Sequence, residues 1–182
     1  MALNDIPLMY KPEHFELYEL VYPEVYDQYA KMNKLHLVWG VLDRYALWTI
    51  DQLRKIYGPC TINNWYQKTD KGYTIRKGSG VFSESGLRRA DTDTGSVLSQ
   101  HKFGRAFDLK FRDIPAPEVV KEMDKLGLFR SGSWRSDPDT KYDAFRYLTT
   151  IERSLNGVPC SWLHIDTRLY TTGNGAVIAL DI

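Results

Sequence analysis

The segment SQHKFGRAFDLKF, residues 99–111, decides how we expect this chain to fold. His101 and Asp108 are too far apart to reach one ion from a single helix face, so the chain must fold back between them. Gly104 is the natural position for that bend. After it, residues 105–111 alternate: Ala106 and Asp108 point to one side, while the apolar residues Phe107, Leu109 and Phe111 point to the other. The pattern predicts a strand with one apolar face in the core and Asp108 on the opposite face.

A second segment near the end of the sequence, residues 161–168, also has the pattern of a strand. Its residues His164 and Asp166 share one face, about 6–7 Å apart. If the two strands are neighbours, His164 can reach the same ion as His101 and Asp108. Two imidazoles and one carboxylate form a catalytic zinc site that leaves one position open for water.

With its motifs in this order, the chain resembles the M15 family of zinc peptidases, which cut peptidoglycan stem peptides and include many phage endolysins. The motifs are S-x-H-x-x-G-x-A-x-D, then W-x-H, preceded by FSESGLR at residues 82–88. The resemblance covers residues 82–168 and implies that Zn²⁺ is bound by His101, Asp108 and His164. It also implies that Arg88 holds substrate, as a planar guanidinium can grip a carboxylate or carbonyl through paired hydrogen bonds. We place Ser99 and Gln100, which precede His101 in the motif, with Arg88 among the substrate-binding residues.

One position departs from the pattern of this family. Many members carry Glu or Asp three residues before the last histidine as general base, and this chain has Ser161, whose hydroxyl cannot act as a base at neutral pH. Asp166 is therefore our candidate for a catalytic carboxylate. Two interpretations of Asp166 stay open: a base for the water, or a structural partner of Arg168 or of a histidine ring.

Composition excludes several classes of function. The chain has 182 residues, with 24 basic and 23 acidic side chains and a formal charge of +1, so no overall field favours nucleic acid or membrane surfaces. Neither a signal peptide nor a membrane-length apolar run is present, so we expect synthesis in the cytoplasm without insertion into a membrane. His14 and His36 lack a ligand-like context. Cys60 and Cys160 are the only cysteines, and we interpret them as buried thiols, although a disulfide stays open.

We expect an α+β fold with a small, mostly antiparallel central sheet that carries the zinc ligands, flanked by N-terminal and other helices, as in M15 and hedgehog-like proteins. One helix is predicted to start near Lys11-Pro12-Glu13 and to break at Pro23. The break interrupts a tyrosine stripe at helical spacing, which we expect to pack against other side chains rather than bind sugar: Tyr18, Tyr22, Tyr26 and Tyr29. Further helices are predicted over residues 35–57 and 115–126. A further helix is predicted from the Asp137-Pro138 pair to residue 155, ended by Asn156-Gly157. Residues 60–65 are predicted as a strand, and residues 67–80 and 90–97 as loops, the second a lid or a solvated connection.

Length predicts one domain over residues 1–182, with a mainly helical cap at 1–80 and a metal-binding catalytic half at 81–182. Two functions stay in competition. The first is a zinc peptidase that acts on peptidoglycan, phage-encoded as an endolysin or a virion component that contacts other virion proteins. The second is a structural virion or wall-binding protein that keeps the fold with weak or no catalysis, an interpretation that Ser161 favours.

Overall fold

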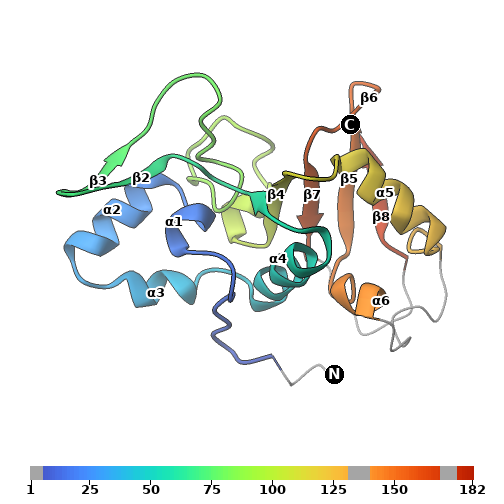
Figure 1. The fold of residues 1–182 in the computed structure, drawn as a ribbon, viewed down its shortest axis with the longest axis horizontal. Coiled ribbons are helices and arrows are strands. Elements are labelled where there is room, and N and C mark those ends of the chain that lie inside the picture. The colour runs from blue at the N-terminus through green and yellow to red at the C-terminus, as the bar shows by residue number, and fades with distance from the viewer. Residues whose placement is uncertain (1–5, 131–139, 169–175) are drawn as a thin grey trace.

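The computed structural model describes residues 6–130, 140–168 and 176–182. The described chain combines helices with one central sheet and a separate hairpin, which confirms the α+β class (Figure 1). The helices are α1 (Leu17–Leu20), α2 (Pro23–Lys31), α3 (Leu35–Trp39), α4 (Arg44–Tyr57), α5 (Ala116–Lys125), α6 (Thr140–Ala144) and the short 3₁₀ helix η1 (Gln100–Phe103). The strands are β1 (Cys60–Thr61), β2 (Tyr66–Thr69), β3 (Gly72–Ile75), β4 (Ala106–Phe111), β5 (Thr150–Leu155), β6 (Val158–Pro159), β7 (Leu163–Asp166) and β8 (Ile178–Asp181).

The central sheet has the strand order β1-β4-β7-β5-β6, and β8 adds to β5. All of its pairings are antiparallel except the one between β5 and β8. The mostly antiparallel sheet predicted from the alternating segments is therefore confirmed. Because β4 and β7 are direct neighbours, the two segments singled out in the sequence lie side by side in the middle of the sheet (Figure 1).

The two faces of the β4–β7 pair have different roles. In the register of this pair Phe107 lies opposite Ile165, and Leu109 opposite Leu163; all four are fully buried. They belong to one continuous core that also contains apolar residues of α4 and α5, among them Leu47, Ile50, Val119 and Met123. Such a face anchors the pair by burial of apolar surface. The opposite face is left for the polar residues between them in sequence.

Several predicted elements are confirmed with small changes at their ends. Strand β4 covers all but the first residue of the predicted segment, β7 lies inside 161–168, and α5 lies inside 115–126, followed by Gly127 at φ 73°. Pro23 separates α1 from α2 as expected and occupies the first turn of α2. The tyrosine stripe packs on aromatic rings, with Tyr18 stacked on Tyr66 at 3.9 Å between centroids.

The helix predicted over 35–57 is wrong in its middle. The chain leaves α3 at Trp39 and starts α4 at Arg44, because the carboxylate of Asp43 accepts hydrogen bonds from the backbone N–H groups of Tyr45 (3.0 Å) and Ala46 (2.9 Å). An N-cap of this kind satisfies donors that would otherwise be unpaired at a helix start. Val41, in the segment between the two helices, is 55 % exposed as a result.

Three further predictions in the N-terminal part need correction. No helix starts near Lys11; the first begins at Leu17, where Glu16 and Glu19 form a reciprocal capping box. The strand predicted at residues 60–65 is only the two-residue β1. The loop predicted at 67–80 contains the hairpin β2–β3, in which Tyr66 and Tyr73 stack at 5.0 Å. Aromatic pairs of this kind stabilise a short hairpin beyond the preference of its turn.

The most consequential correction concerns the segment before β7. The predicted helix start at Asp137-Pro138 lies outside the described residues; α6 ends at Ala144, and Thr150–Leu155 form strand β5 instead of helix. Asn156 and Gly157, predicted to stop a helix, have φ 51° and 76° and connect β5 to β6 as a two-residue hairpin turn. This change places the side chain of Glu152 on the central sheet.

Among the described residues, the structure has no helix with the length and apolar character needed to span a membrane. Cys60 and Cys160 are both buried free thiols, as interpreted from the sequence.

Candidate metal centre

The register of β4 and β7 brings two of the three predicted ligands together. Asp108 and His164 are direct cross-strand partners, and both lie on the face opposite the apolar pairs Phe107–Ile165 and Leu109–Leu163. Side chains of such partners stand about 4.5–5.5 Å apart at Cβ, close enough for their polar ends to meet. The alternation that buries the core therefore also pairs a carboxylate with an imidazole.

The third ligand, His101, reaches the pair because the chain reverses at Gly104. Helix η1 ends there in the left-handed conformation, φ 67°, and the chain continues into β4. Gly104 also lies against the N-terminal part, where an added Cβ would come within 2.8 Å of the carbonyl oxygen of Val41. Both the positive φ and the close approach require glycine. The predicted bend is confirmed, and it turns the imidazole of His101 toward Asp108.

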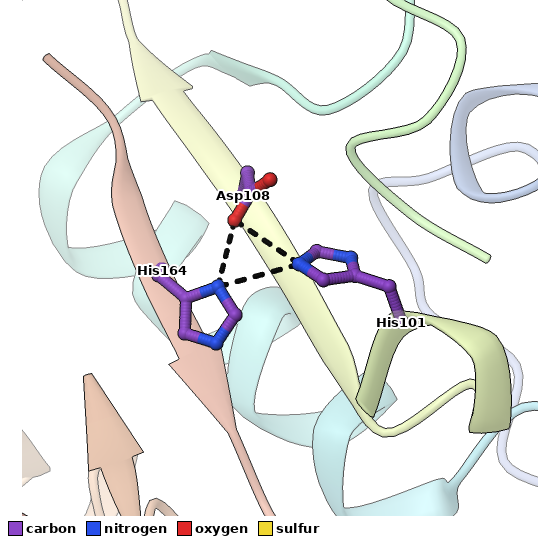
Figure 2. A group of neighbouring side chains, drawn as sticks. All are labelled: His101, Asp108 and His164. Carbon is purple, nitrogen blue, oxygen red and sulfur yellow. Dashed lines mark hydrogen bonds and ion pairs between the residues drawn. The ribbon is translucent and has the colours of Figure 1, made fainter. Parts of the chain in front are cut away.

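The ligand atoms of His101, Asp108 and His164 form a small triangle (Figure 2). Oδ1 of Asp108 lies 2.8 Å from Nδ1 of His164 and 3.3 Å from Nε2 of His101, and the two nitrogens are 3.3 Å apart. Atoms bound tetrahedrally at about 2.0–2.1 Å from one Zn²⁺ ion are separated by about 3.3 Å. Two edges of the triangle already have this length, and the third requires a movement of about half an ångström. The three residues therefore fit a metal ion of this size.

Contacts behind the ligands fix which atoms face the centre. Nδ1 of His101 lies 2.9 Å from the carbonyl oxygen of Gly86, which can only accept, so Nδ1 carries the hydrogen and Nε2 keeps its lone pair. Gly86 lies so close to the N-terminal part that an added Cβ would overlap the backbone carbonyl of Leu20. Metal-binding histidines commonly donate their second nitrogen in this way, which orients the ring.

The charges of the metal-free site favour a cation. Burial by itself would raise the pKa of Asp108, but its interactions with His101 and His164 outweigh burial and hold that pKa far below the ordinary value. Burial would lower the pKa of His164, yet contacts with Asp108, Asp166 and Glu152 raise it to about 9. A proton on His164 therefore partly neutralises the carboxylate of Asp108 when no metal is bound. A metal ion would replace that proton as the positive charge.

Arg88 occupies the position next to the second oxygen of Asp108. Its guanidinium lies 3.2 Å from Oδ2 of Asp108, and Nε donates to the carbonyl oxygen of Glu84 at 2.6 Å. The side chain is 13 % exposed and lines the cavity in front of the ligands. Arg88 can thus hold the Asp108 carboxylate in place while it presents its remaining donors to a bound molecule.

Asp166 lies near Nε2 of His164, on the opposite side of the ring from the ligand atom Nδ1. It is fully buried; Oδ1 accepts from the backbone N–H of Arg168 at 2.6 Å, and Oδ2 accepts from Nε of Arg168 at 2.5 Å. Oδ2 is 3.9 Å from Nε2 of His164, the ring nitrogen that faces away from Asp108. Burial would raise the pKa of Asp166, but interactions with His164 and Arg168 outweigh it and lower the pKa. Of the two interpretations left open by the sequence, this geometry supports the partner of Arg168 and the histidine ring.

A cavity of about 480 Å³ opens in front of the triangle, a size in the usual range for sites that bind small molecules. Ser99 and Gln100 line it, as do Leu155, Leu180 and Ile182 on an apolar wall. Oε1 of Gln100 and Nε1 of Trp162 are buried at this cavity without a hydrogen-bond partner among the described residues. One unpaired acceptor and one unpaired donor match what a peptide group offers.

The cavity also contains a carboxylate that the sequence did not single out. Glu152, on β5, has Oε1 3.9 Å from Nδ1 of His164, on the ligand side of that ring. We missed Glu152 because we interpreted this segment as a helix. The signals that could have found it were the β-branched pair Thr150-Ile151 and the Asn-Gly dipeptide at 156–157, which together are typical of a strand entering a hairpin.

Ser161, His14 and His36 complete the set of positions discussed from the sequence, and His36 is exposed on α3. Ser161 is exposed, just before β7. His14 belongs to a second group with Glu13 and Asp51, and its Nδ1 lies 2.8 Å from Oδ1 of Asp51. There Nζ of Lys55 lies 2.9 Å from Glu13 and 3.9 Å from Asp51, so an ammonium already supplies positive charge. We therefore interpret the second group as an ion-pair network, which leaves His101, Asp108 and His164 as the candidate metal centre.

Comparisons of the chain with models of protein families, with curated proteins and with solved structures found no match.

Proposed function

We propose that this protein is a zinc-dependent peptidase that hydrolyses amide bonds in peptidoglycan stem peptides or cross-links. The observation that carries the proposal is the ligand triangle of His101, Asp108 and His164, whose open side faces the cavity. Two imidazoles and one carboxylate are a common ligand set of catalytic zinc sites. When bound, Zn²⁺ would acidify a water molecule and polarise the carbonyl of the scissile bond.

The side chains around the cavity support a peptide as substrate. The unpaired polar atoms of Gln100 and Trp162 can pair with a peptide N–H and carbonyl, while Arg88 and Arg168 offer guanidinium groups for a carboxylate. The apolar wall suits a small aliphatic side chain such as that of alanine. The resemblance of residues 82–168 to M15 peptidases favours peptidoglycan among peptide substrates, and with it a phage-encoded endolysin or virion component that acts on the wall.

The rival proposal, a structural virion or wall-binding protein on the same fold, rests on Ser161. A chain that lacks an acid at this position can bind metal and substrate without turnover, because the water has no base there. The two proposals differ in one measurable property, the release of fragments from the wall.

The test is mass spectrometry of purified sacculi after incubation with the zinc-loaded protein. The peptidase proposal predicts new peptide ends at one type of bond, absent with His101→Ala and with the metal-free protein. Zinc-loaded protein that binds sacculi but releases no fragments would contradict the peptidase and favour the structural rival.

A further inference from the structure

We propose that Glu152 is the general base of this site, in place of the acid that Ser161 does not supply. The inference rests on the proposed hydrolysis. In the step we assign, the carboxylate of Glu152 takes a proton from the attacking water as the water oxygen bonds to the carbonyl carbon. The same carboxyl group then gives the proton to the amine nitrogen as the C–N bond breaks.

The sheet places Glu152 at the open side of the ligand triangle. Strands β5 and β7 pair with Thr150 opposite Asp166, and Glu152, two residues further along β5, lies on the same face of its strand as Thr150. On the other side of β7, His164 is opposite Asp108. Three adjacent strands therefore carry Asp108, His164 and Glu152, and Glu152 approaches His164 from the strand on the other side of β7.

The distance of Glu152 from the ligands suits a base rather than a fourth ligand. Its Oε1 is 3.9 Å from Nδ1 of His164, yet Glu152 does not belong to the group whose ligand atoms all lie within 4.8 Å of one another. A carboxylate in this position would border an ion held by the triangle without joining its ligands. That is where a group must lie to contact a water in the open coordination position.

Glu152 is also the carboxylate that is free to act. Among the described residues that line the cavity it is the only acid besides Asp108, and its one ion-pair contact in the described chain is the long one to His164. Its side chain is 27 % exposed, so water and substrate can reach it. Asp166, in contrast, does not line the cavity, and Arg168 engages both of its oxygens.

The test compares Glu152→Gln with Glu118→Gln, an exposed glutamate on α5 remote from the cavity, as matched control. Glutamine keeps the size of Glu152 and cannot accept the proton, so we expect the rate of sacculus digestion to fall by about 10²–10⁴ with one zinc still bound per chain. Asp166→Asn should instead weaken zinc affinity by about 10–100-fold, because Asp166 acts through the ring of His164. Adding Ser161→Glu to Glu152→Gln should restore part of the rate by placing a carboxylate on the adjacent segment.

A second readout does not depend on sacculus digestion. Acetohydroxamic acid binds zinc as an anion and gives its proton to a neighbouring base, so Glu152→Gln should weaken its binding to the zinc-loaded protein by at least about tenfold, while Glu118→Gln should not. Unchanged hydroxamate binding in Glu152→Gln would overturn the inference, as would loss of zinc from that variant or, where the wild type digests sacculi, an unchanged digestion rate. If the wild type digests no sacculi and hydroxamate binding still depends on Glu152, the proposed function fails and the assignment of the base stands.

Discussion

Asp108 is the residue that joins the parts of the candidate site. Its Oδ1 contacts both histidines, and its Oδ2 contacts the guanidinium of Arg88. The side chain is almost completely buried, and a buried carboxylate is stable only with such partners or with a metal. The sequence singled out His101, Asp108 and His164 because the order of their motifs resembles a family of zinc peptidases, and the two alternating segments explain why Asp108 and His164 share a face.

The raised pKa of His164 predicts how metal binding depends on pH. Without metal, His164 keeps a proton up to a pKa of about 9, above its ordinary value of about 6.5. Zinc must displace this proton, so affinity should rise about tenfold per pH unit between pH 6.5 and 9 and level off above. Calorimetric titrations in buffers of different ionisation enthalpy should detect release of about one proton per zinc at pH 7.5.

The raised pKa of His164 also predicts that the metal-free protein loses stability as pH rises. Because the folded-state pKa of His164 is higher than the unfolded one, the stability from its contact with Asp108 is complete below about pH 6.5 and is lost as pH rises through 9. Thermal unfolding of the metal-free protein should therefore shift to lower temperature over this range. No proton release on zinc binding and a flat stability profile would show that His164 is neutral in the metal-free protein.

Among the helices and strands, the spacing of apolar residues predicted those with one buried face and failed for β5, whose apolar residues also fit a helix. Strands β4 and β7 and helix α5 have a single strong period, and all were predicted. The segment before β7 contains Phe145, Leu148, Ile151 and Leu155 at helical spacing, but Thr150–Leu155 pair with β7 and β8 instead. The helical spacing outweighed the strand signals of Thr150-Ile151 and Asn156-Gly157 in our interpretation, and Glu152 was missed with the strand.

The reversal between η1 and β4 can be tested with two glycines of similar backbone conformation. Gly104 and Gly127 have φ of 67° and 73°, but an added Cβ meets the carbonyl oxygen of Val41 at Gly104 and open space at Gly127. Gly127→Ala should lower the free energy of unfolding by about 1–2 kcal/mol, the cost of a left-handed alanine. Gly104→Ala should lower it further and weaken zinc binding, because η1 must move and takes His101 with it. Equal losses in chemical denaturation would contradict this role of Gly104.

At the scale of the whole molecule, one core connects the N-terminal helices to the strands that carry the ligands. Leu20, Leu47 and Leu163 belong to the same buried cluster, and Gly86 and Gly104 lie against the backbone of Leu20 and Val41. Helix α1 and the segment between α3 and α4 thus lie against the loop before Arg88 and the end of η1, which carries His101. A sequence pattern indicates that such helices exist, but not which loops they support, because these contacts depend on packing between distant segments.

Binding of one metal ion at His101, Asp108 and His164 can be measured by equilibrium dialysis against Zn²⁺ with elemental analysis. We predict one zinc per chain in the wild type, almost none in His101→Ala or His164→Ala, and one in His14→Ala, which alters the other group of potential ligands. Circular dichroism would confirm that each variant is folded. A full zinc in His101→Ala, or loss of zinc in His14→Ala alone, would contradict the account.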